Sequence, residues 1–136
     1  MDILEDVKMR LISFGYNVDE TEGSIDLYII NHMINKVTNH IKNSCNISSI
    51  PEGLYEVAID MVCGNFLKEK KIMDADSLSH INLEFGIKSI KEGDTQVEYA
   101  VSQDSSSTPD AKFDAFVQYL IEHGEKDFVT YRDFSW

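Results

Sequence analysis

The chain has 136 residues, of which 43% are hydrophobic, and a formal net charge of −12 at pH 7. This length is typical of one domain, so we expect residues 1–136 to fold as a single unit. A net negative charge opposes a protein that binds nucleic-acid phosphates, which requires a basic surface. It does not oppose a protein that stands beside DNA without binding it.

Two further classes are disfavoured by the distribution of apolar and charged residues. No run approaches the roughly 20 apolar residues of a membrane-spanning helix, so we expect no membrane association. The first ten residues carry acids where a secretory signal carries bases before an apolar run. We therefore expect the protein to be made and to remain in the cytoplasm of its cell.

The motifs of catalysis and cofactor binding are missing. The sequence has no GxSxG, Walker or HExxH motif, and its glycines are isolated. Cys45 and Cys63 lack the spacing of a zinc site or a disulfide framework. The acidic connector at residues 16–23 lacks the alternating ligand pattern of a calcium loop. We expect no enzyme, no metal and no cofactor.

Hydrophobic periodicity predicts a mainly α fold, a small bundle of about four helices. Asp2 and Ser24 are suited to cap the first two helices, and Pro51 and Pro109 suit the first turns of the other two. The expected helices cover residues of about 2–14, 25–43, 52–71 and 109–123.

The third helix is expected to organise the fold. Its apolar residues recur at three- and four-residue steps and form a stripe broad enough to require cover from at least two other elements: Leu54, Val57, Ala58, Met61, Val62 and Phe66. Gly64 interrupts this stripe at a cost of about 1 kcal/mol relative to Ala. That cost predicts a close approach by a neighbouring helix at Gly64.

A β-hairpin is predicted at about residues 83–101, between the third and fourth helices. Apolar side chains alternate on both sides of a turn centred on Gly93 and Asp94. A two-stranded hairpin is marginal in water, and its edges can accept strands from another subunit. Packing onto the protein's own helices is the alternative. A polar linker follows at residues 102–110.

The C-terminal residues 125–136 are predicted to form an extended docking tail. They contain four aromatic residues beside Arg132, a composition found in interface anchors: Phe128, Tyr131, Phe134 and Trp136. Packing of this tail back onto its own domain is the alternative.

The order of these pieces resembles the head–tail connector (adaptor, or head-completion) proteins of long-tailed phages and of prophage elements in Gram-positive bacteria. The matching residues are INKVTNHIKNSCNISSIPEGL at 34–54, AIDMVCGNFLKEKK at 58–71, IKSIKEGDTQVEYA at 87–100 and YRDFSW at 131–136. No single motif is diagnostic. The combination of SIKEGDTxV, a following helix and a YR…W ending is fairly specific.

The resemblance implies a structural subunit of the virion that forms a ring of twelve copies beneath the portal protein. Such a ring extends the DNA channel and is a platform for the next head-completion or tail protein, and DNA passes through it without specific binding. The C-terminal residues Phe128, Tyr131, Arg132, Phe134 and Trp136 would contact the portal. The hairpin would make intersubunit or next-ring contacts through residues Ile90, Gly93, Asp94, Val97 and Tyr99.

A rival interpretation comes from another class of protein. A small acidic regulator or inhibitor could bind a basic partner through its charged surface. The two interpretations differ in stoichiometry, because a connector forms rings and a regulator forms a small fixed complex.

Overall fold

The computed structural model describes residues 2–78, 81 and 109–132. Its helices are α1 (Ile3–Ser13), α2 (Ile25–Cys45), α3 (Tyr55–Met73), α6 (Pro109–Glu122) and the short α7 (Phe128–Tyr131). Three 3₁₀ turns join them: η1 (Glu52–Leu54), η2 (Ala75–Leu78) and η3 (Glu125–Asp127). The prediction of a mainly α fold with four principal helices is confirmed. Within the described ranges there is no β-strand, and the hairpin predicted at residues 83–101 lies outside them.

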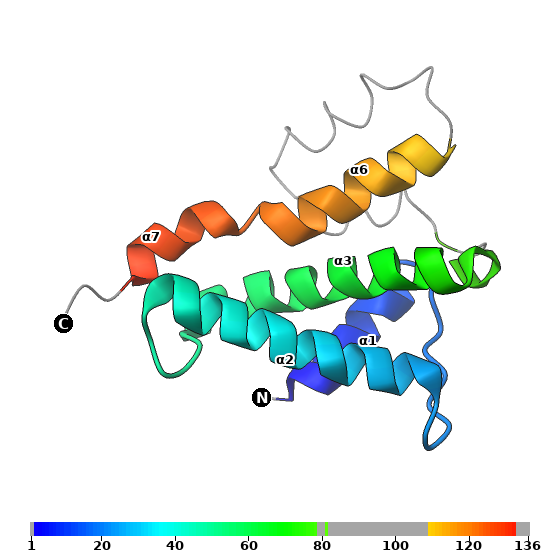
Figure 1. The fold of residues 1–136 in the computed structure, drawn as a ribbon, viewed down its shortest axis with the longest axis horizontal. Coiled ribbons are helices and arrows are strands. Elements are labelled where there is room, and N and C mark those ends of the chain that lie inside the picture. Colours follow the sequence, from blue (N-terminus) through cyan, green and yellow to red (C-terminus); the bar gives the residue numbers. More distant parts are fainter. Residues whose placement is uncertain (1, 79–80, 82–108, 133–136) are drawn as a thin grey trace.

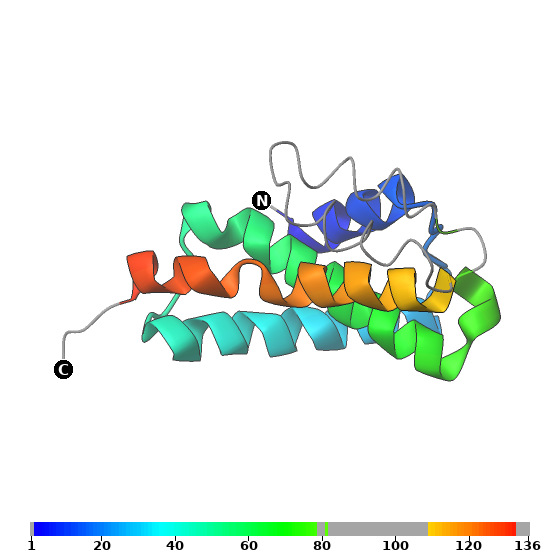
Figure 2. The same ribbon diagram turned by 90° about the horizontal axis from the view of Figure 1, so that it is seen from above.

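Helix α3 is the centre of the bundle. It packs against α1, α2 and α6, and Figure 1 shows it between α2 and α6. Its side chains are buried around nearly the whole circumference, including the adjacent run from Val57 to Gly64. Figure 2 shows the same arrangement from above, with α3 crossing beneath α6. The prediction that this helix requires cover from at least two other elements is confirmed.

The ends of the first two helices follow local chemistry. The Asp2 carboxylate accepts hydrogen bonds from the backbone N–H groups of Leu4 and Glu5, and the Ser24 hydroxyl accepts one from Leu27. Helix α1 ends at Ser13, and two residues later Gly15 has a φ of +97°, in the left-handed region that favours glycine. Both predicted caps are confirmed.

Three helix boundaries differ from the prediction by two residues or more, and one of them is the end of α3, which continues to Met73 and not to residue 71. Helix α2 continues to Cys45 and ends where Asn46 adopts a left-handed conformation, with φ of 56°. Pro51 is extended and precedes the 3₁₀ turn η1, so the regular α-helix begins only at Tyr55.

Gly64 lies where α6 approaches α3. A Cβ atom built at this position would be 2.9 Å from Leu120 Cβ and 2.9 Å from Ile121 Cγ1. Such distances are too short for real Cβ contacts, so no larger residue fits without a shift of the helices. The predicted close approach of a neighbouring helix is confirmed.

The C-terminal region differs from the extended tail predicted from residue 125. Residues 125–131 are helical, as η3 and α7, and the chain becomes extended only at Arg132. The reason is the burial of Phe128, which joins the hydrophobic core. Up to Arg132, the alternative of packing onto the domain itself is correct. Phe134 and Trp136 lie outside the described residues.

Candidate interaction site at the C-terminal strap

Residues 124–132, here called the C-terminal strap, cover one end of the bundle. The strap follows α6 directly, and its helix α7 packs on α2 near the C-terminal end of α2 (Figure 1). Most of its side chains are exposed, and only Gly124 and Phe128 are buried. The strap is therefore attached to the bundle through few side chains.

Phe128 is the apolar anchor of the strap. Its side chain is only 3% exposed, and its ring lies edge-on to His40, with ring centroids 5.8 Å apart. The backbone carbonyl of Phe128 accepts a weak hydrogen bond from the Cys45 thiol at 3.7 Å. Fully burying a Phe side chain contributes about 1.5–3 kcal/mol. Phe128 thus holds the strap and is not available to a partner while the strap is docked.

Two glycines allow the strap to approach the bundle closely. A Cβ atom at Gly53, in η1, would overlap the Tyr131 hydroxyl. A Cβ atom at Gly124 would overlap the side chain of Val57 on α3. The strap is therefore fitted to η1 at one end and to α3 at the other.

Polar contacts fix the edges of the strap. His40 Nε2 on α2 lies 2.9 Å from Glu125 Oε1, and both side chains are about half exposed. Arg132 Nε donates to the backbone carbonyl of Ser44 at 3.1 Å. Exposed ion pairs contribute little, about 0–1 kcal/mol. These contacts set the position of the strap more than its stability.

A surface hollow of about 670 Å³ lies in the loop between α2 and η1. Five loop residues line it: Asn46, Ile47, Ser48, Ser49 and Pro51. The strap contacts both elements that this loop connects, through Ser44 on α2 and Gly53 in η1. The hollow and the strap therefore occupy the same end of the bundle.

The predicted site residues divide into two groups. The strap brings together the three that the structure describes. Of these, Phe128 is buried, Tyr131 is half-buried and Arg132 is exposed. The other predicted residues lie outside the described part of the chain: Phe134, Trp136, Ile90, Gly93, Asp94, Val97 and Tyr99.

A buried carboxylate that sequence reasoning missed joins three helices. Asp60 on α3 is 6% exposed and forms an ion pair with Arg10 on α1. His123 Nε2, just after α6, lies 2.9 Å from the other oxygen of Asp60. Arg10 also pairs with Glu56, one turn earlier on α3. The cluster fixes α1 and the end of α6 on the central helix.

The nearby Cys63 is not a candidate nucleophile. Burial raises the pKa of its thiol well above the ordinary range, so the thiol remains protonated at neutral pH. Its polar contact is a long one, 3.9 Å to the carbonyl of Val7. We assign it to the core.

A second buried ion pair joins α2 to α3. Lys70 Nζ lies 2.9 Å from Asp26 Oδ1. The Tyr16 hydroxyl and the Asp19 backbone N–H donate to the other Asp26 oxygen at 2.7 and 3.0 Å. Burial alone would raise the pKa of Asp26, but the hydrogen bonds from Asp19, Tyr16 and Lys70 together hold it below its ordinary value.

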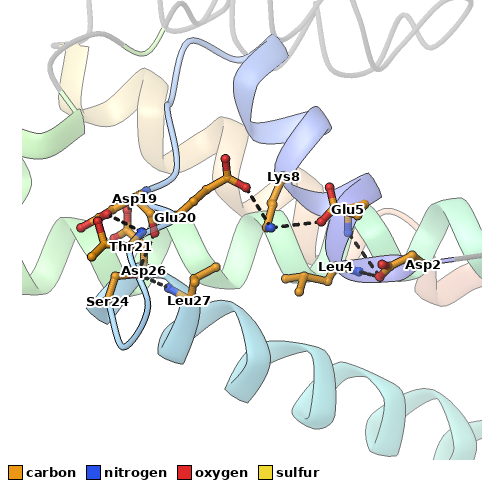
Figure 3. A network of polar contacts seen from close by, with 10 residues as sticks. All are labelled: Asp2, Leu4, Glu5, Lys8, Asp19, Glu20, Thr21, Ser24, Asp26 and Leu27. Atoms are coloured by element: carbon orange, nitrogen blue, oxygen red, sulfur yellow. Dashed lines mark hydrogen bonds and ion pairs between the residues drawn. The ribbon is translucent and has the colours of Figure 1, made fainter.

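The acidic connector is held by contacts within the protein. Figure 3 shows Lys8 on α1 donating to Glu5 at 3.1 Å and to Glu20 at 2.9 Å. In the same view, the Asp19 carboxylate accepts from the backbone N–H of Thr21. In the described part of the chain, no group of three or more His, Cys, Asp or Glu side chains is placed to hold a metal ion.

The comparisons with known proteins give no assignment. No protein-family model matches the chain, and neither a curated protein nor a solved structure shows a significant match to it. None of the helices in the described ranges is long and apolar enough to cross a membrane. The case for a function therefore depends on the residues and their arrangement.

Proposed function

We propose that this protein is a structural head–tail connector subunit that forms a ring beneath a phage portal. The proposal is supported by the resemblance of residues 34–54, 58–71, 87–100 and 131–136 to connector proteins. It is also supported by the helical bundle, in which the buried side chains of the described residues pack against one another or form ion pairs between helices. The ring would extend the DNA channel and give the next head-completion or tail protein its platform.

The observation that carries the proposal is the placement of the strap. Phe128 and Tyr131 attach the end of the chain to α2 and η1, and Arg132 is held at the surface by the Ser44 carbonyl. The last four residues, which include Phe134 and Trp136, therefore begin from a fixed point on the bundle. A fixed starting point lowers the entropy lost when a short aromatic segment binds a partner.

This placement changes the role that we propose for each aromatic residue. Phe128 and the buried side of Tyr131 hold the strap, while Arg132, Phe134 and Trp136 contact the portal. The hairpin residues Ile90, Gly93, Asp94, Val97 and Tyr99 are proposed to contact a neighbouring copy or the next ring. The sign of the net charge fits a channel wall that repels DNA phosphates and lets DNA pass without binding.

The test removes residues 133–136 and leaves the strap in place. We expect the variant to unfold at the same urea concentration as the full chain, because Phe128 and Tyr131 are retained. Its binding to the portal from the same genome, measured by pull-down and native mass spectrometry, should be lost. The matched control keeps the full-length chain and replaces the exposed Lys126 by Ala. This variant should still bind the portal.

Two outcomes show whether the last four residues contact the portal. Loss of portal binding in the deletion but not in Lys126→Ala supports the proposed contacts. Portal binding that survives the deletion would reject a portal-facing role for Phe134 and Trp136.

A further inference from the structure

We propose that the surface hollow in the loop between α2 and η1 holds the side chain of Trp136 when no partner is bound. The occupant is thus residues 133–136 of the same chain, the segment that follows the C-terminal strap. The inference goes beyond the portal contact proposed above, because it says where Trp136 lies in the free protein. The position of the hollow, its distance from the strap and its lining all favour this occupant.

The end of the strap lies against both sides of the hollow. The hollow is lined by residues of the loop 46–51. On the α2 side of this loop, the backbone carbonyl of Ser44 accepts a hydrogen bond from Arg132 Nε at 3.1 Å. On the η1 side, a Cβ atom at Gly53 would overlap the Tyr131 hydroxyl, so the two residues are in close contact. The chain that follows Arg132 therefore begins beside the hollow.

A segment of four residues is long enough to reach the hollow. An extended chain spans at most about 3.3–3.6 Å per residue, so residues 133–136 can extend about 14 Å from Arg132. Ser44 and Gly53 are each two residues from the lining of the hollow, which is at most about 8 Å along the backbone. Arg132 itself is extended, with ψ of 132°, and does not continue α7. Trp136 is therefore within reach while the strap stays in place.

The lining has the mixed character that suits a tryptophan. Ile47 and Pro51 are half-buried and supply apolar surface, while Ser48 and Ser49 are exposed and supply hydroxyl groups. An indole combines a large apolar ring with one N–H donor, which usually finds a hydrogen-bond partner where the ring is buried. The volume of about 670 Å³ is within the range of roughly 300–1,000 Å³ found for ligand pockets. Phe134 could cover the apolar part but has no donor for the hydroxyl groups.

A docked Trp136 is withheld from the portal, and this consequence rests on the proposed function. Partial availability of a binding group lowers the apparent affinity by the available fraction. If the hollow holds Trp136 in about three quarters of the free molecules, a blocked hollow should tighten portal binding about fourfold in a titration. Docking of so short a segment is a local equilibrium that is released in urea before the bundle unfolds. It therefore leaves the unfolding midpoint of the bundle unchanged.

The experiment uses Trp136 as its own probe, because it is the sole tryptophan of the chain. Its fluorescence emission and its quenching by acrylamide are measured in the full-length protein without a partner. The variant Ser48→Glu/Ser49→Glu places two carboxylates in the hollow, and an indole that covered them would remove their water. At the same docked fraction, quenching should be about fourfold weaker in the native protein than in this variant, with emission at a shorter wavelength.

A matched control adds the same charge to α2, away from the hollow. Asn31→Glu/Asn35→Glu replaces two exposed residues, and Asn35 lies about 15 Å along the helix from Cys45. Quenching of Trp136 in this control should equal that in the native protein. Circular dichroism should show the same helix content in all three proteins.

Two results would overturn the docking of Trp136. One is equal quenching in the native protein and in Ser48→Glu/Ser49→Glu. The other is an equal rise in quenching in both variants, because the change would then not depend on the hollow.

The portal separates this inference from the proposed function. If the portal binds through residues 133–136 while quenching shows no docking, the docking alone fails. If docking is found and the portal does not bind, the proposed function fails and the docking stands. A portal affinity that is equal in the native protein and in Ser48→Glu/Ser49→Glu would overturn the competition for Trp136.

Discussion

Gly64 shows how a single residue sets the distance between two helices. Replacement by Ala would add about 1 kcal/mol of helix propensity. The new methyl group would meet Leu120 Cβ and Ile121 Cγ1 at 2.9 Å, and overpacking of this kind typically costs about 1–3 kcal/mol. We expect Gly64→Ala to lower the free energy of unfolding by about 1 kcal/mol, because the overpacking outweighs the gain in propensity.

Urea unfolding followed by circular dichroism measures this effect. Lys68→Ala is the control, since Lys68 is exposed on the same helix and should change stability by no more than about 0.5 kcal/mol. A stabilised Gly64→Ala protein would show that α6 does not pack on α3 at this point.

Lys70 matters because it balances a buried charge. Lys70→Met would leave the Asp26 carboxylate buried without its cation, and breaking a buried pair in this way costs about 3–5 kcal/mol. The double variant Lys70→Met/Asp26→Asn removes the unpaired charge and should recover part of the loss. Urea unfolding of the three proteins at pH 7 gives both comparisons.

The lowered pKa of Asp26 also predicts how the stability of the Lys70→Met variant depends on pH. In the native protein this pKa is lowered, so the stabilisation is present above the ordinary value near 4 and is lost as the pH falls through the lower, folded-state value. Without Lys70 the carboxyl group is easier to protonate, and protonation removes its buried charge. The stability difference between the native protein and Lys70→Met should therefore narrow from pH 7 to pH 3. A difference that widens would show that Lys70 does not stabilise the ionised Asp26.

The strap provides a prediction at the scale of an element. Phe128→Ala removes its single large buried side chain, worth about 1.5–3 kcal/mol of docking. Local opening of the strap should then increase about tenfold or more. Opening uncovers Cys45, which is fully buried in the native protein.

The rate at which Cys45 reacts with a thiol reagent measures that opening. In Phe128→Ala this rate should rise, while Cys63, which is fully buried against α1, stays protected. Val129→Ala is the control, because Val129 is 62% exposed on the same turn. An unchanged rate for Cys45 would mean that Phe128 does not hold the strap.

Local patterns predicted the elements that local forces determine. The periodic stripe on α3 and the caps at Asp2 and Ser24 depend on neighbours within a few helical turns. The close approach at Gly64 was predictable because it depends on a single steric requirement. The 3₁₀ start of the third helix was not predictable in this way, because Gly53 lies in η1 beneath Tyr131, a residue 78 positions later.

The strap shows the limit of composition as a guide. Phe128, Tyr131 and Trp136 are equally aromatic, and nothing in their sequence distinguishes an exposed anchor from a buried one. The buried pairs Asp26–Lys70 and Asp60–Arg10 were missed for the same reason, since each joins different helices. The sequence features that could have indicated the docked strap are Gly53 and Gly124, because each has no side chain at a point where another segment lies against the backbone.

At the scale of the whole molecule, the structure is a helical bundle organised by one central helix and closed by a strap at one end. The buried ion pairs around α3 orient α1, α2 and α6, and the strap fixes the point from which the C-terminus begins. A protein built in this way suits a role in which surfaces must be held in fixed positions for assembly. This is the property that we propose it supplies to a connector ring.

The most direct measurement is the mass of the full-length protein by native mass spectrometry and light scattering, alone and with the portal from the same genome. The proposed function predicts a closed multimer, either by itself or when the portal is present. A monomer whose mass is unaffected by the portal would contradict it, and would favour the alternative of a small acidic regulator.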